Sequence, residues 1–117
     1  MPTEMFNEAE AFEALEYLVS TGVLDRRGTG GDSEVNLSDS FRKTMLSVSK
    51  EVEWGESYDE NVGVLLVTSL VNHYDCVVGK KINKKRLTIC TNLLLPLVPE
   101  AAIKLMVRRN EAEAGRT

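Results

Sequence analysis

The chain has 117 residues, a mass of 13.0 kDa and a formal net charge of −4, which fits a single domain with one core. Hydrophobic residues at 43% and charged residues at 27% exclude wholesale disorder and a fibrous repeat. The uncharged apolar run 63–71 is shorter than the roughly 20 residues that span a bilayer, and the acidic segment 1–10 is unlike a secretory signal. We therefore expect a soluble cytoplasmic protein that binds no membrane.

The charges are divided unevenly along the sequence. Residues 1–60 hold 14 acidic and 5 basic side chains, whereas residues 61–117 hold 4 acidic and 9 basic ones. Such polarity is either internal, with the two halves facing each other, or external, with the basic half presented to an anionic partner. The sequence leaves both options open.

The first predicted helix covers residues 7–19. Asn7 and Glu10 have the spacing of a capping box, and acidic residues near the start suit the positive end of the helix dipole. Gly22 supplies a left-handed stop. The apolar positions recur at helical spacing, which predicts a buried stripe of Phe12, Leu15 and Val19.

Residues 23–37 interrupt the helical pattern. They contain the run GTGG, in which three glycines in four residues favour a turn. The segments VLDRR and SEVNL on either side carry apolar residues at alternate positions. They are therefore able to pair as one small, exposed β-hairpin.

Two helices are predicted to follow. The first begins at Ser38 or Asp39 and ends at Gly55, and its apolar sector is Phe41, Met45, Val48 and Val52. Ser57 then opens a second capping box ahead of residues 60–75. That segment is apolar nearly all round, which predicts the central buried helix, although its valines leave a strand as an alternative.

A fourth helix is predicted after Gly79. Apolar positions between 82 and 94 share one side of a helical wheel, the lysines share the other, and Pro96 ends the helix. Arg86 is the exception, since it points toward the apolar sector. In a rival geometry, residues 75–78 and 87–90 pair as strands and the lysines lie at the tip of a hairpin.

The last predicted helix starts with Pro99 at its first position, and its buried stripe is Ala102, Ile103, Met106 and Val107. Residues 111–117 have no apolar anchor and are expected to be a disordered tail. The sequence thus predicts a mostly α protein: a single compact domain over residues 1–110 with about five short helices. A small β-hairpin around residues 23–37 is an optional addition to this fold.

No group of residues has the pattern of a catalytic site. His73 is the only histidine and falls on an apolar helical face, which favours a core histidine over a catalytic one. With Asp75, Cys76 and Cys90 it falls short of a matched set of zinc ligands, and the Gly-Lys pair at 79–80 lacks the flanks of a phosphate loop. We predict no enzyme, no cofactor and no metal, and two buried free thiols.

Seven basic residues are candidates for binding an anion or a partner. The stretch GKKINKKR places five of them close together, and two more adjoin the glycine-rich loop. Three interpretations are open: a solvated lysine face, contact with the acidic half of this chain or of a second copy, or contact with a nucleic-acid backbone. The candidates are Lys80, Lys81, Lys84, Lys85, Arg86, Arg26 and Arg27.

Residues 14–45 read ALEYLVSTGVLDRR, then GTGGDSEVNLSDSFRKTM, and this order is similar to the later part of a winged-helix DNA-binding module. The resemblance covers about a quarter of the chain and implies DNA contact through Arg26 and Arg27 on the wing. It departs from the module in one respect, because only about a dozen residues precede it where two further helices are normal. The pI of about 5.0 also argues against nucleic acid.

The sequence therefore predicts a small non-enzymatic helical protein that works by association with itself or with a protein partner. The alternative is a winged-helix-like regulatory protein that binds nucleic acid through the loop arginines and the lysine-rich stretch.

Overall fold

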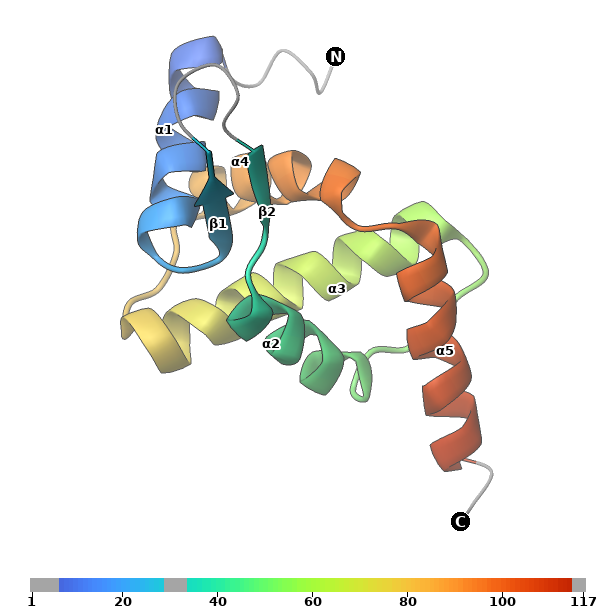
Figure 1. The fold of residues 1–117 in the computed structure, drawn as a ribbon. Helices are drawn as coiled ribbons and strands as arrows, with labels where there is room; N and C mark the ends of the chain where they lie inside the picture. Colours follow the sequence, from blue (N-terminus) through green and yellow to red (C-terminus); the bar gives the residue numbers. More distant parts are fainter. Residues whose placement is uncertain (1–6, 29–33, 115–117) are drawn as a thin grey trace.

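The computed structural model describes residues 7–28 and 34–114. Helices dominate these residues, and one two-stranded antiparallel sheet lies beside α1, which confirms the mostly α class and the small hairpin (Figure 1). The elements in chain order are α1 (Glu8–Ser20), β1 (Leu24–Arg27), β2 (Glu34–Leu37), α2 (Asp39–Ser49), α3 (Tyr58–His73), the π-helical turn η3 (Tyr74–Val78), α4 (Lys84–Leu94), the 3-10 turn η4 (Leu95–Leu97) and α5 (Glu100–Ala114).

Side-chain caps fix the starts of four helices. Asn7 accepts from the amide of Glu10 at 2.9 Å, and Ser38 accepts from that of Phe41 at 3.0 Å. Ser57 caps α3 in the same way, and Asn83 caps α4. Each cap satisfies an amide that the helix leaves without a partner. The predicted caps of the first three helices are confirmed.

The hairpin packs directly against the end of α1. Gly22 has φ +81°, in the left-handed region, and lets the chain reverse so that the Val23 amide donates to the Leu18 carbonyl at 2.9 Å. In the sheet register Leu24 faces Leu37. The glycine-rich turn itself lies largely outside the described residues.

The helix α3 lies across the middle of the molecule (Figure 1). The helices α4 and α2 run along its two sides, and α1 with the hairpin packs beyond α4. The largest fully buried side chains come from all of these elements and form one core: Leu18, Leu24, Phe41, Leu65, Leu66, Leu70, Tyr74 and Leu94.

The helix α2 is shorter than predicted. It ends at Ser49, and Val52 lies in the following turn rather than on the helix. The reason is a set of competing hydrogen bonds: the Ser49 hydroxyl donates to the Leu46 carbonyl at 2.6 Å, and the Trp54 indole donates to the Ser49 carbonyl at 3.1 Å. Asn61 then ties the loop to α3 by bonding both the amide and the carbonyl of Gly55.

The segment around Gly79 also differs from the prediction. The strand pairing of residues 75–78 with 87–90 is wrong, because the first segment is a π-helical turn and the second belongs to α4. Gly79, with φ +74°, closes that turn, and the Lys80 amide donates to the Tyr74 carbonyl at 2.9 Å. Since α4 begins only after the Asn83 cap, Lys80 and Lys81 precede the helix instead of lying on its polar side.

Several predicted burials differ as well. Phe12 is 62% exposed, because α1 turns Ala14 and Leu18 toward the core. Cys90 is buried as expected, whereas Cys76 is exposed, although both are free thiols. The helix α5 buries Ile103 and continues through residues 111–114, which were predicted to belong to a tail.

One helical run among the described residues, Tyr58–Val78, passes a length and composition test for a membrane span, with a mean hydropathy of 1.2. A bent pair, Lys84–Leu97 with Glu100–Arg109, also passes, with 96° between its helices. The first run is longer than the uncharged apolar stretch 63–71 that the sequence contains. The fold buries 44% of an 18-residue window within this run, and the core helix of a soluble protein passes the same test.

Candidate association surface

The basic cluster, defined as Lys80, Lys81, Lys84, Lys85 and Arg86, begins in the loop after Gly79 and runs into α4. The Arg86 guanidinium lies over the ring of Tyr17 in α1, with its central carbon 4.4 Å from the ring centroid. Tyr17 in turn stacks on Tyr74, with centroids 5.4 Å apart. Arg86 therefore packs between helices, as its place on the wheel predicted.

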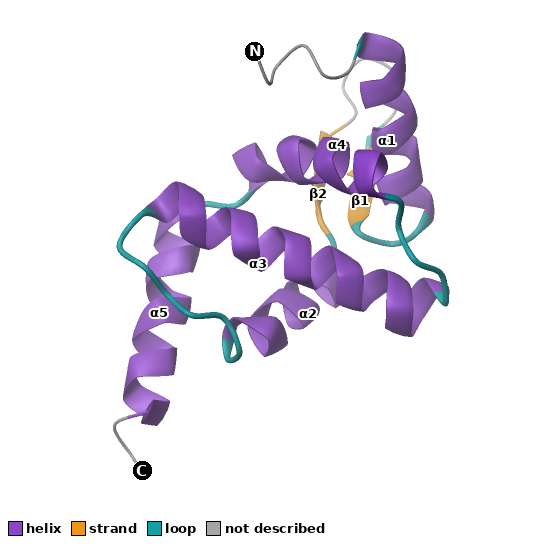
Figure 2. Cartoon of the chain, turned by 180° about the vertical axis from the view of Figure 1, so that it is seen from behind, coloured by secondary structure: helices purple, strands orange, loops and turns teal. Residues whose placement is uncertain are grey.

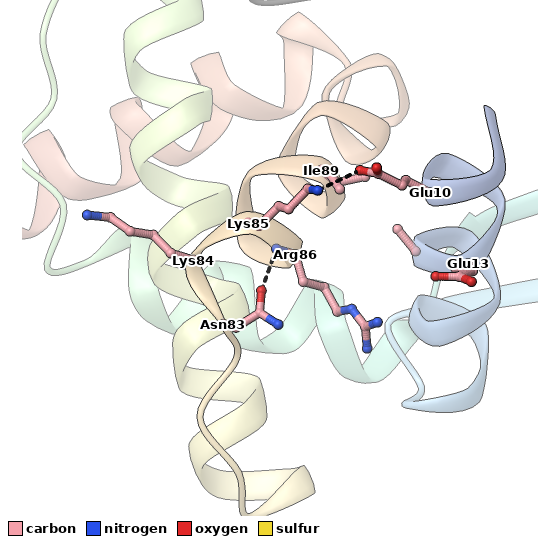
Figure 3. A pocket seen from close by; sticks show the side chains of 8 residues that line it. Glu10, Glu13, Asn83, Lys84, Lys85, Arg86 and Ile89 are labelled. Atoms are coloured by element: carbon pink, nitrogen blue, oxygen red, sulfur yellow. Dashed lines mark hydrogen bonds and ion pairs between the residues drawn. The ribbon is translucent and has the colours of Figure 1, made fainter. Parts of the chain in front are cut away.

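Two further cations meet the acidic helix α1. The Lys85 ammonium lies 3.2 Å from the Glu10 carboxylate (Figure 3). Arg26 on β1 forms a two-armed ion pair with Glu16, in which one guanidinium nitrogen is 3.4 Å from a carboxylate oxygen and the other is closer. The hydrogen bond to Glu16 and its negative charge raise the pKa of Arg26 above its usual value. The Lys85–Glu10 pair joins the basic half of the chain to the acidic half, so part of the charge polarity is internal.

The other four candidates are exposed. Lys80, Lys81 and Lys84 have no ion pair with any described residue, and Arg27 stands opposite Glu34 in the hairpin register. Lys84 points away from the acidic side chains of α1 (Figure 3). The structure therefore divides the seven candidates and does not gather them into one site.

A cavity of about 510 Å³ opens between α1 and the start of α4 (Figure 3). Glu10 and Glu13 line it together with Lys84, Lys85 and Arg86. A phosphate in this cavity would meet two carboxylates beside the cations, which weakens any electrostatic attraction. The lining is a poor match for an anion site.

The outer side of α3 carries an apolar surface that the sequence pattern did not reveal. Val64, Val67 and Val71 are 46%, 38% and 48% exposed, and we call these three residues the valine face. Figure 2 shows α3 running across the molecule, and the exposed fractions show that the described elements leave these three valines partly uncovered. The spacing of the valines, three and then four residues, was visible in the sequence, but the neighbouring leucines made the whole segment look buried.

Charged residues of opposite sign flank the two ends of the valine face. Asp59 and Glu60 are exposed in the first turn of α3, at its N-terminal end. Beyond the C-terminal end lie Asp75 and then Lys80 and Lys81, all exposed. The N-terminal end is therefore acidic, whereas the C-terminal end has a net positive charge.

His73 is a core histidine, as predicted. It is 1% exposed, and its Nε2 lies 2.7 Å from the carbonyl oxygen of Thr21. Phe41 and Tyr74 meet the ring edge-on, with centroids 5.9 and 5.7 Å away. Within residues 7–28 and 34–114, no three histidine, cysteine or acidic side chains are placed to hold a metal ion.

Comparisons with protein-family models, with curated proteins and with solved structures found no match for this chain.

Proposed function

We propose that this protein works by association, and that it pairs with a second copy of itself through the valine face. The observation that carries the proposal is the exposure of Val64, Val67 and Val71 in one line along the central helix. Isolated exposed apolar residues are normal, whereas a continuous apolar line rimmed by polar residues is typical of an interaction surface.

The charges favour a second copy in antiparallel orientation. A two-fold axis near Val67 would bring the acidic N-terminal end of one α3 toward the C-terminal end of its partner. There Asp59 and Glu60 would approach Lys80 and Lys81, with Asp75 as the one opposing acid. Charge complementarity of this kind sets the orientation of an interface more than its affinity.

The expected affinity is modest. Three half-exposed valines offer much less than the roughly 1,200–2,000 Å² that stable interfaces bury in total. We therefore expect a dissociation constant in the micromolar range or weaker. The valine face carries no group that could do chemistry, and the proposal assigns it neither a reaction nor a cofactor.

Sedimentation velocity over a concentration range from about 10 µM to 1 mM tests the proposal. The wild-type sedimentation coefficient should rise with concentration, and Val67→Glu should abolish the rise because it places a charge at the centre of the face. Leu105→Glu is the matched control, since Leu105 is 54% exposed and belongs to a different helix, α5. A wild type that stays monomeric throughout, or two variants that behave alike, would refute the proposal.

A charge swap tests the orientation. Reversal of Lys80 and Lys81 to Glu should weaken pairing, and a second reversal of Asp59 and Glu60 to Lys in the same chain should restore it. If the second reversal fails to restore pairing, the antiparallel arrangement is wrong even where pairing itself persists.

The nucleic-acid alternative finds less support. The order helix, strand, strand, helix expected over residues 14–45 is present, but α1 carries Glu8, Glu10, Glu13 and Glu16 and no basic residue. Two of the basic candidates, Arg26 and Lys85, already pair with acids of that helix. Retardation of a DNA or RNA fragment at low salt that vanishes as salt rises would favour the alternative.

A further inference from the structure

Gly63 lies inside α3, beside the valine face, at a position where the fold itself does not require a glycine. Its φ is not positive, and an added Cβ would meet no atom of the rest of the molecule within 4 Å. Glycine in the middle of a helix is less stable than alanine, because it loses more backbone freedom on folding. The isolated chain would therefore gain from alanine here, and the open space beside Gly63 is reachable from outside.

Gly63 belongs to a row of residues that runs along the exposed side of α3. Val67 and Val71 follow it at intervals of four residues, so that successive members are displaced by only about 40° around the helix axis. Gly63 is partly exposed, and Val71 is the most exposed valine of the face, at 48%. The row thus has a gap at one end, which we call the notch, and a projecting side chain at the other.

The two-fold axis placed near Val67 brings the two ends of this row together. In an antiparallel pair of helices, a residue four positions before the axis lies opposite a residue four positions after it in the other copy. Gly63 of one copy then faces Val71 of the second copy, and the symmetry repeats this contact. Without a Cβ at one side, the helix axes can approach to the short end of the usual range of roughly 8–10 Å.

A second register competes with this one. If the axis lay between Val67 and the next residue, Val71 would stand opposite Val64 of the second copy, and the notch would stay empty. Val64 is 46% exposed, so the apolar surface alone hardly separates the two registers. The glycine separates them, because only the first register uses the space that its missing side chain leaves.

We propose that Gly63 determines the specificity of the valine-face dimer, by forming the notch that accepts Val71 of a second copy. This inference rests on the proposed self-association and adds its register. The notch would also exclude partners, because a larger side chain at position 63 of either copy would collide with the valine opposite.

Sedimentation velocity on volume-swap variants tests the notch. Gly63→Ala should raise the dissociation constant about tenfold, because overpacking occurs at two symmetric contacts. Gly63→Ala with Val71→Ala should pair more tightly than Gly63→Ala alone, because the shortened side chain makes room for the added methyl group. Gly63→Ala with Val64→Ala is the matched control, since it removes the same atoms from a valine of similar exposure, and it should bring no recovery.

Thermal unfolding of the monomer separates the notch from a structural role. At about 5 µM, where pairing is negligible, Gly63→Ala should be at least as stable as the wild type, because alanine favours the helix. A variant that is more stable as a monomer and pairs less tightly has lost an intermolecular fit. A variant that is less stable as a monomer would contradict the argument that the fold does not require this glycine.

Intermolecular disulfides test the register directly, in chains that carry Cys76→Ala so that the exposed thiol is removed. Copies with Gly63→Cys, mixed with copies with Val71→Cys in a glutathione redox buffer, should form mixed disulfide dimers. Neither copy alone should do so, because identical positions would lie about 12 Å apart along the helices. A mixture of Val64→Cys with Val71→Cys should react several-fold less.

The outcomes separate this inference from the proposed function. Pairing of Gly63→Ala that equals or exceeds that of the wild type would overturn the notch and leave valine-face pairing intact. Recovery by Val64→Ala in place of Val71→Ala, or a faster disulfide between positions 64 and 71, would favour the second register and overturn it as well. A wild type that does not pair at any concentration would overturn both proposals.

Discussion

The guanidinium of Arg86 lies over the ring of Tyr17, and this contact joins α4 to α1 across the core. Tyr17 stacks nearly parallel on Tyr74, with 10° between the ring planes, so that the cation caps a pair of aromatic rings. A cation over an aromatic face is attracted by the electron density of the ring. One residue of the basic cluster therefore has a structural role that its neighbours lack.

The first prediction concerns Arg86. Arg86→Ala should lower the free energy of unfolding by about 1 kcal/mol, through loss of the contact with Tyr17. Lys84→Ala is the matched control, because it removes an exposed cation from the same turn of α4 without that contact, and we expect a change within about 0.5 kcal/mol. Urea titrations followed by circular dichroism compare the two, and equal effects would show that the ring contact adds nothing.

The second prediction compares two glycines. A Cβ added at Gly63 or Gly79 would meet no atom within 4 Å, so alanine causes no steric clash at either position. Gly63 lies inside α3, where alanine should raise the free energy of unfolding by about 0.5–1 kcal/mol. Gly79 has φ +74°, where alanine should lower it by about 1 kcal/mol or more. The midpoint temperatures of thermal unfolding should shift in opposite directions in the two variants, and shifts of the same sign would contradict the backbone argument.

The third prediction concerns alkaline pH. Burial raises the pKa of the Cys90 thiol to about 11, with the nearby charge of Arg86 opposing it, and burial also raises the pKa of the Tyr74 phenol. Below about pH 9 the folded and unfolded chains both keep these protons. Between about pH 9 and 11 the unfolded chain releases the thiol proton while the folded protein holds it, so stability should fall.

Urea unfolding at pH 8 and pH 10.5 measures this loss, to which Cys90 should contribute about 1–2 kcal/mol. Cys90→Ala should be less stable at pH 8, because it opens a cavity in the core, but should lose less on going to pH 10.5. Cys76→Ala, at the exposed thiol, should keep the full pH dependence. Identical pH dependence in the two variants would rule out Cys90 as a source.

The sequence predicted the helices through their local chemistry. Asn7, Ser38 and Ser57 accept amide hydrogens within one turn of their own position, and Gly22 needs only its own freedom at positive φ. Such signals do not depend on the rest of the fold, so they can be read without it. The helix α4 begins later than predicted because Asn83, which lies among the lysines, caps it through the same local chemistry.

The surfaces could not be predicted in the same way. Whether Phe12 or Ala14 faces the core depends on where α4 lies. Which side of α3 stays exposed depends on which of its sides α2 and α4 cover. The partners of Lys85 and Arg26 are likewise set by tertiary packing. Glu10, the partner of Lys85, is remote from it in sequence, and Glu16, the partner of Arg26, lies on the other side of the turn after α1.

The packing of α1 against α4 also bears on the order of events in folding. Synthesis runs from the N-terminus, so α1 is complete long before residues 84–94 exist to cover it. Until then its only nearby support is the hairpin, through bonds such as that from the Val23 amide to the Leu18 carbonyl. Closing so long a stretch of chain carries an entropic cost that the local helices do not bear. The first helix to be made is therefore among the last to be secured, and Glu10 stays without Lys85 until the basic half has been added, whereas the partner of Glu16, Arg26, follows within ten residues.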